Sequence, residues 1–198
     1  IGLPMSLGMY ELLPLWNGIF THLGFSAIIS DPSTRATYEK GQFTIPSDTA
    51  CYPAKLMHGH IEELLEQKPD AIFYPCLTYN IDEHSSDNHY NCPVVAYYSE
   101  LLSGNIEELK NTRFLHPYLN VNKPKELARE LHKVLNSAFG KVFKRSEIYE
   151  AVMYGFSEYQ RYMEDVRRHG REAIKEARRA GKRIMILAGR PYHIDPEI

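Results

Sequence analysis

The stretch IGLPMSLGMYELLPLWNGIFTHLGFSAIIS, residues 1–30, decides the fold class of this chain. Residues 1–4 form a short apolar run that predicts a strand, and residues 8–23 carry apolar side chains at helical spacing up to a stop at Gly24. The apolar run at residues 25–30 predicts a second strand. A strand, a helix and another strand in this order indicate a parallel β-α-β unit.

The same alternation continues as far as residue 98. Residues 31–34, Asp-Pro-Ser-Thr, have the composition of a helix cap, and Pro53 opens a helix that is predicted to reach residue 67. Residues 71–76 and 93–98 are apolar runs that each predict a buried strand. We therefore expect an α/β fold with a Rossmann-like parallel sheet and flanking helices.

The second half of the chain has a helical pattern. Residues 123–136 and 147–180 carry apolar side chains at helical spacing, which predicts two long helices that each pack one face on a partner. After Gly181, the apolar run at residues 182–189 predicts a buried strand. The expected organisation is a cysteine-bearing α/β domain at 1–120, a helical segment at 121–181 and the first strand of a truncated second α/β unit at 182–198.

Composition excludes several classes of function. The 198 residues are 43% hydrophobic, which allows a sizeable core, and the formal charge of −2 gives no general attraction to nucleic acid or anionic membranes. No apolar run approaches the roughly 18 residues of a membrane-spanning helix. The sequence also has no phosphate-binding glycine loop and no nucleophile elbow, so its catalytic residues stay unknown. We expect a cytoplasmic protein without a nucleic-acid or membrane partner.

Three cysteines form the candidate site: Cys51, Cys76 and Cys92, each within two residues of a proline. Their odd number argues against a set of disulfides, and their spacing is too long for the Cys-x-x-Cys pattern of most structural zinc sites. One interpretation is a group of thiolates that separate loops bring together around a soft metal centre. The other is that they are small apolar residues of the core.

The predicted elements place two of these cysteines together. Cys51 precedes the helix that Pro53 opens, where free backbone N–H groups and the helix dipole favour a thiolate. Cys76 ends a strand, and ligands of parallel sheets collect at the carboxyl ends of the strands. Cys92 precedes the strand predicted at 93–98, which puts it about 20 Å from that edge at roughly 3.3 Å per residue. A loop that folds back, or an antiparallel strand, would be needed to bring Cys92 in.

Histidines give a second set of candidates. His58 and His60 lie two residues apart on a predicted helix, so their side chains point to different faces and are poorly placed to share one metal. His84 and His89 lie in a polar loop with several acidic residues. Such a loop could bind a hard or borderline cation, or it could simply be solvated.

Longer strings around the cysteines and near the end of the sequence carry a family resemblance. They are IPSDTACYPAKLMHGH at 45–60, IFYPC at 72–76, YNCPVV at 90–95 and GRPYHIDPE at 189–197. Over nearly its whole length the chain resembles the uncharacterised domain of the large CoA-substrate-specific enzyme activases, also called acyl-CoA dehydratase activase-related proteins. That domain is similar in turn to subunits of the 2-hydroxyacyl-CoA dehydratases of anaerobic bacteria, which are two-lobed α/β proteins that hold a 4Fe-4S cluster between their lobes.

The resemblance implies that Cys51 and Cys76 bind a 4Fe-4S cluster, with Cys92 as a third candidate ligand and a residue outside this chain completing the site. The implied function is low-potential electron transfer, or reductive activation of an acyl-CoA enzyme. The implied partners are that enzyme and other domains of the full-length chain, including an ATPase module upstream. We expect this stretch alone to be inactive.

Two other functions stay open from the residues alone. One is a non-catalytic scaffold or docking domain in which the cysteines are structural or bind zinc. The other is a small-molecule binding lobe with its ligand at the strand ends.

Overall fold

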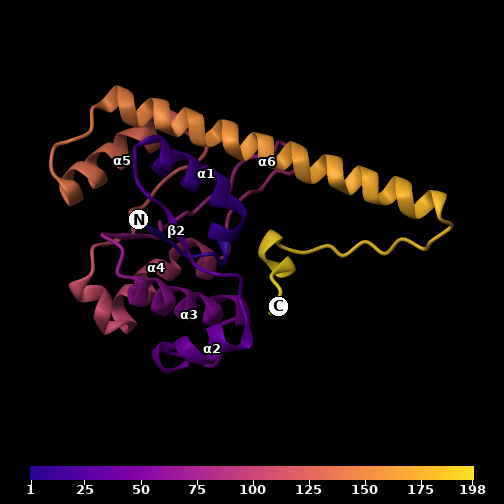
Figure 1. The fold of residues 1–198 in the computed structure, drawn as a ribbon, viewed down its shortest axis with the longest axis horizontal. Coiled ribbons are helices and arrows are strands. Elements are labelled where there is room, and N and C mark those ends of the chain that lie inside the picture. Colours follow the sequence, from indigo (N-terminus) through magenta and orange to yellow (C-terminus); the bar gives the residue numbers. More distant parts are fainter.

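A four-stranded parallel sheet lies between two layers of helices (Figure 1). The computed structural model describes all residues from 1 to 198. The sheet has the order β2-β1-β3-β4, and its strands are β1 (Gly2–Leu3), β2 (Ile28–Ile29), β3 (Ile72–Phe73) and β4 (Phe114–Leu115). A parallel bridge between Cys76 and Tyr118 continues the pairing of β3 and β4 beyond their assigned ends. The expected α/β class with a parallel sheet and flanking helices is confirmed.

The helices divide between the two faces of this sheet. One layer contains α1 (Gly8–His22), α5 (Pro124–Phe139) and α6 (Arg145–Arg179), and the other contains α2 (Arg35–Gly41), α3 (Tyr52–Gln67) and α4 (Pro93–Asn105). Three short 3-10 helices complete the set: η1 (Gln42–Thr44), η2 (Glu107–Asn111) and η3 (Pro191–Ile194). The long helices agree within a few residues with those that the apolar periodicity predicts.

The first layer packs closely because two helices cross at glycines. A side chain carbon added to Gly155 of α6 would lie 2.6 Å from the carbonyl oxygen of Leu15 and 2.6 Å from Ile19 Cγ1, both on α1. Gly18 of α1 faces the same crossing, because a side chain carbon added to it would lie 3.0 Å from Gly155 Cα. Trp16 and Phe20 on the same helix pack their rings on Phe73 of the sheet. One apolar core therefore joins the sheet to the helices of the second half of the chain.

The strand expected at residues 93–98 is wrong, because these residues form the first half of α4. Pro93 occupies the first turn of this helix, where its fixed backbone angle and missing N–H are tolerated. Cys92 is the residue that caps the helix, and its sulfur accepts a hydrogen bond from the Val95 N–H at 3.4 Å. A short apolar run has no periodicity that distinguishes a strand from a buried helix.

The buried strand expected at residues 182–189 is also wrong. The segment is exposed, and none of the backbone hydrogen bonds within the chain involves residues 183–189. Figure 1 shows it running from the far end of α6 back toward the body of the molecule. The fourth strand of the sheet is β4, and not the segment at 93–98; no apolar run in the sequence predicted a strand there. The division of the chain at residues 120 and 181 stays a prediction.

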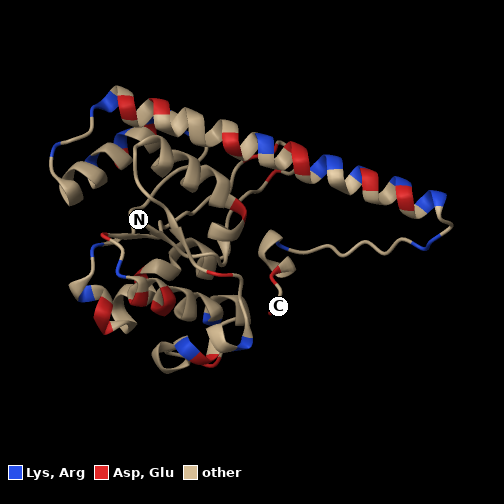
Figure 2. Ribbon diagram, viewed as in Figure 1, with Lys and Arg blue, Asp and Glu red and all other residues tan.

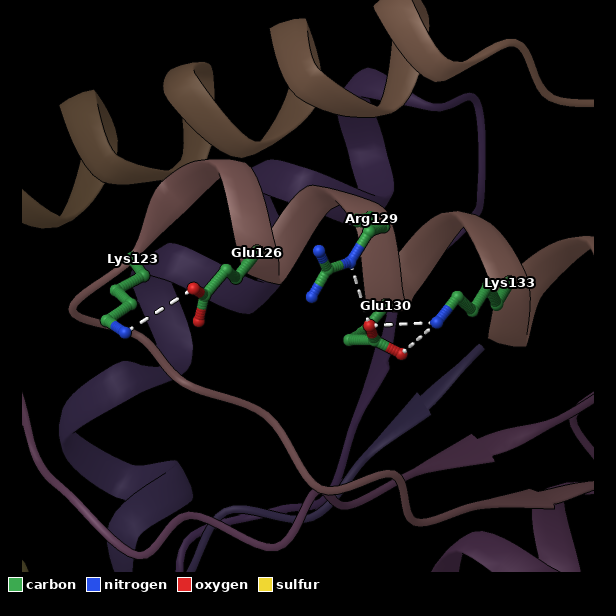
Figure 3. A network of polar contacts seen from close by, with 5 residues as sticks. All are labelled: Lys123, Glu126, Arg129, Glu130 and Lys133. Atoms are coloured by element: carbon green, nitrogen blue, oxygen red, sulfur yellow. Dashed lines mark hydrogen bonds and ion pairs between the residues drawn. The ribbon is translucent and has the colours of Figure 1, made fainter.

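Charged residues cover the outer faces of the first layer. On α5, Glu130 pairs with Lys133 at 3.0 Å and with Arg129 at 3.1 Å, and Lys123 pairs with Glu126 at 3.4 Å (Figure 3). Figure 2 shows both charges along α6, which is buried only in its first half. Exposed pairs of this kind add little stability, so these surfaces are solvated faces of amphipathic helices.

Candidate functional site

All three cysteines lie at the carboxyl edge of the sheet. Cys76 follows β3, whereas Cys51 and Cys92 cap the N-termini of α3 and α4. In a parallel α/β fold the helices run back against the strands, so the ends of strands and the starts of helices share one edge. The predicted common edge for Cys51 and Cys76 is confirmed in this topological sense. Cys92 joins them because it begins a helix, where the sequence had placed it before a strand at the opposite edge.

Two of the three thiols are open to solvent. Cys51 and Cys92 are exposed and free, and each has the extended backbone of a residue that precedes a helix. Each is followed within two residues by a proline in the first helical turn. Thiols in this position are accessible to a metal centre or to a thiol reagent.

Cys76 has a different environment. Its side chain is 1% exposed, and its sulfur lies 3.0 Å from Ser99 Oγ of α4. Burial raises the pKa of the Cys76 thiol, and the hydrogen bond to Ser99 offsets this only in part. The thiol is therefore neutral at physiological pH in the absence of a bound metal.

A buried hydroxyl near this edge lacks a partner. Tyr74 immediately follows β3 and is 2% exposed, yet its hydroxyl forms no hydrogen bond. Burial raises its pKa well above the usual value, and the neighbouring thiols of Cys76 and Cys92 act in the same direction. Buried hydroxyl groups nearly always have an acceptor, so an acceptor supplied by a bound group would satisfy Tyr74.

Residues 1–198 do not bring together a complete set of metal ligands. No group of three or more His, Cys, Asp or Glu side chains is close enough to hold a metal ion in this arrangement. The thiol chemistry and the unpartnered Tyr74 hydroxyl fit a thiolate-bound cofactor, but the Cys76 side chain faces Ser99. A cofactor at this edge would therefore need Cys76 to turn, or a further ligand from outside residues 1–198.

His58 is part of the buried structure of the second layer. Its Nδ1 lies 2.8 Å from Thr44 Oγ1, and Thr44 donates its own proton to the Gly41 carbonyl oxygen. His58 must therefore carry its proton on Nδ1 and accept at Nε2 from the Tyr98 hydroxyl, 3.0 Å away. Burial lowers the pKa of His58 to about 4, which keeps the ring neutral.

His60 has the opposite tautomer. Ser30 accepts the Met5 N–H and donates its proton to His60 Nδ1, at 2.8 Å. On the other side, His60 Nε2 lies 2.8 Å from Ser33 Oγ, which donates to the Asp195 carboxylate at 2.6 Å. His60 therefore donates from Nε2 to Ser33. Burial lowers the pKa of His60 to about 4.

Both rings are fully used by the protein, so neither is available as a metal ligand. The expectation that His58 and His60 point to different faces is confirmed, because they contact different elements. Gly59 between them allows α2 to approach, since an added side chain carbon would overlap the Thr37 carbonyl oxygen. His84, by contrast, is exposed and pairs with Asp82 at 3.3 Å.

The C-terminal segment, residues 190–198, reaches this same edge. Asp195 is 5% exposed and bonds to Ser33, and Glu197 accepts a hydrogen bond from the Tyr52 hydroxyl at 2.7 Å. Burial raises the pKa of the Tyr192 hydroxyl, and the thiols of Cys92 and Cys51 act in the same direction. Sequence reasoning missed this contact, because the bonded residues lie far apart in the chain and their types carry no shared motif.

The sequence profile of the CoA enzyme activase uncharacterised domain (DUF2229) matches residues 1–198, which is the whole chain. The chain belongs to this family. Membership connects it with the activation of CoA enzymes. Comparisons with curated proteins and with solved structures found no match. None of the helices is both long and apolar enough to span a membrane.

Proposed function

We propose that this domain of the CoA enzyme activase family carries an iron–sulfur cluster at its cysteine edge and supports reductive activation of an acyl-CoA enzyme. The observation that carries the proposal is the common edge: Cys51, Cys76 and Cys92 all lie at the carboxyl ends of the strands and the starts of helices. Thiolates are the ligands that iron–sulfur clusters require. A bound 4Fe-4S cluster would supply one-electron transfer at low potential.

The protein side of this proposal assigns different tasks to the residues. Cys51 and Cys92 offer accessible sulfur atoms at the N-termini of two helices, and the Cys92 sulfur already accepts a hydrogen bond from the Val95 N–H. Cys76 would need to exchange its hydrogen bond with Ser99 for a metal bond. The Tyr74 hydroxyl would then donate to a cluster sulfur or to a thiolate, which is the kind of hydrogen bond that tunes cluster potential.

Part of the proposal is that residues 1–198 act within a longer chain that carries further domains. The test is anaerobic reconstitution with iron and sulfide of residues 1–198 and of that longer chain. Replacing Cys51, Cys76 or Cys92 by Ser keeps the size of the side chain but removes a good iron ligand. We expect the longer chain to bind iron and sulfide in equal amounts, and each ligand variant to lose most of both. We expect residues 1–198 alone to bind weakly, because their own ligand set is not closed. Ser85→Ala, in an exposed loop, is the matched control and should bind as the parent does.

A scaffold role is the second candidate, and one observation favours it. Cys76 is buried and hydrogen bonded as a structural thiol would be. If the longer chain takes up zinc or no metal, the electron-transfer proposal is wrong. Uptake of zinc would make the cysteines zinc ligands, and no uptake of metal together with a loss of stability in Cys76→Ser would make Cys76 a structural residue.

A further inference from the structure

The strand order contains a point where the chain changes direction across the sheet. From β1 the chain passes to β2 on one side, and it then returns to place β3 on the other side of β1. The helices that follow these strands lie on opposite faces of the sheet, so a crevice opens outside the carboxyl ends of β1 and β3. Open parallel sheets bind small ligands at such a point.

A hydrogen bond marks this crevice. Glu11 lies in the first turn of α1, directly after β1, and Asn80 lies in the loop after β3. Asn80 Nδ2 donates to Glu11 Oε2 at 2.9 Å, so the two elements that flank the crevice are joined there. The Glu11 carboxyl is partly buried, and this burial raises its pKa.

A cavity of about 310 Å³ lies beside Glu11, between α1, α6 and residues 187–194. Seven of its twelve lining residues are hydrophobic, among them Met163, Val166 and Ile194. Ligand pockets typically start at about 300 Å³ and combine apolar walls with a few polar groups. The size and walls of this cavity fit the apolar body of a small organic molecule.

The free polar groups of the cavity are mainly hydrogen-bond donors. The hydroxyls of Tyr10 and Tyr162 and the guanidinium of Arg190 form no hydrogen bond or salt bridge with the rest of the chain. His193 accepts the Arg190 N–H at Nδ1, which leaves Nε2–H as a donor in its neutral form. The one acidic group, Glu11, already accepts from Asn80.

The excess of hydrogen-bond donors over acceptors indicates which kind of ligand fits the cavity. Arg190 supplies a fixed positive charge with five N–H donors, and a planar carboxylate matches its geometry. Burial raises the pKa of Tyr10, so its hydroxyl keeps its proton at neutral pH. A ligand with acceptor oxygens at one end and an apolar body satisfies the lining better than a cation or an amine does.

We propose that this cavity, between the first turn of α1, the middle of α6 and residues 187–194, binds a small aliphatic carboxylate or a related carbonyl compound. The cavity contains no cysteine, so the site does not depend on whether the cysteine edge holds iron.

The test measures binding of octanoate and of its neutral analogue octanamide to the metal-free chain under reducing conditions, by chemical-shift titration. Octanoate should bind at one saturable site, with shifts confined to the elements around the cavity. Arg190→Gln should weaken octanoate binding roughly fivefold, the effect of one exposed ion pair, and leave octanamide binding within about twofold. Val166→Trp, on an exposed part of α6, should fill the cavity and abolish binding of both probes.

Arg178→Gln removes the same charge from the far end of α6, outside the cavity, and should leave both affinities unchanged. The proposal is overturned if octanoate does not saturate, or if Val166→Trp binds it as well as the parent chain. It is also overturned if Arg178→Gln and Arg190→Gln weaken octanoate equally, because binding would then follow overall charge. Circular dichroism of each variant establishes that the fold is intact.

Discussion

Ser33 Oγ donates a 2.6 Å hydrogen bond to Asp195 Oδ2, and so joins residues 162 positions apart in the chain. Ser33 follows β2 at the carboxyl edge of the sheet, and Asp195 lies in the C-terminal segment. Because both groups are buried and His60 donates to the same serine oxygen, the contact is a continuous polar network. Such networks are stabilising when every member has a partner and costly when one is removed.

The first prediction concerns this network. Ser33→Ala should lower the free energy of unfolding by about 1–3 kcal/mol, because it leaves a buried His60 N–H and the Asp195 carboxylate each without one partner. Hydrogen exchange in the C-terminal segment should become faster, since its buried anchor is lost. Ser85→Ala, in an exposed loop, is the control and should change neither quantity. Unchanged exchange in residues 190–198 of Ser33→Ala would show that other contacts hold the segment.

A second prediction uses two glycines of α6. Gly155→Ala should destabilise the protein by about 1–3 kcal/mol, because the added carbon would lie 2.6 Å from atoms of Leu15 and Ile19. Gly170→Ala meets nothing within 4 Å and should stabilise the exposed half of the same helix by up to about 1 kcal/mol. Urea unfolding measures both. Equal effects of the two substitutions would mean that helix propensity, and not the close crossing with α1, determines the outcome at Gly155.

Helical periodicity made the larger part of this fold predictable from sequence. The long amphipathic helices α5 and α6 repeat their apolar pattern over several turns, and α3 has a proline at its start. The strands were harder to predict, because each is two residues long and β4 is not marked by an apolar run. The segment at 93–98 shows the same limit, since an apolar run of six residues fits either a strand or a buried helix.

The candidate site was predictable only in part. Helix and strand ends placed Cys51 and Cys76 correctly, but the position of Cys92 depended on the nature of the element after it. The network of Ser33, His60 and Asp195 joins distant parts of the chain, and single residues of these types carry no signal of pairing. Long-range polar contacts follow from the assembled fold, so local patterns do not reveal them.

A third prediction concerns the dependence of stability on pH. His58 and His60 have pKa values of about 4 in the folded protein, against the ordinary histidine value of 6.5 that applies to the unfolded chain. As the pH falls, the histidines of the unfolded chain bind protons before those of the folded protein. The stability that the neutral rings provide is therefore complete above pH 6.5, and it is lost between pH 6.5 and 4. The loss at pH 5 should be on the order of 2 kcal/mol per histidine.

Urea unfolding at pH 7 and pH 5 measures this loss. His58→Asn should lower the free energy of unfolding at both pH values. It should also make the difference in this free energy between pH 7 and pH 5 smaller, by about the contribution of one histidine. His169→Asn, on the exposed half of α6, should leave the difference unchanged. A difference that both variants share with the parent chain would show that other groups, and not the buried rings, cause the loss.

The last prediction tests the geometry of the cysteine edge without any metal. Cys51 and Cys92 are exposed, whereas Cys76 is 1% exposed, and burial raises the pKa of its thiol. A thiol reagent attacks the thiolate, so both the lack of access and the raised pKa slow its reaction with Cys76. In the native protein, a disulfide reagent should modify two thiols quickly and the third roughly 100-fold more slowly, at a rate set by local opening. Under denaturing conditions all three should react at similar rates.

Cys76→Ser should remove the slow phase alone, and Cys51→Ser should halve the fast phase, as followed by absorbance of the released thiolate. Three fast thiols in the native protein would mean that Cys76 is already turned toward solvent, in which case it needs no rearrangement to serve as a metal ligand.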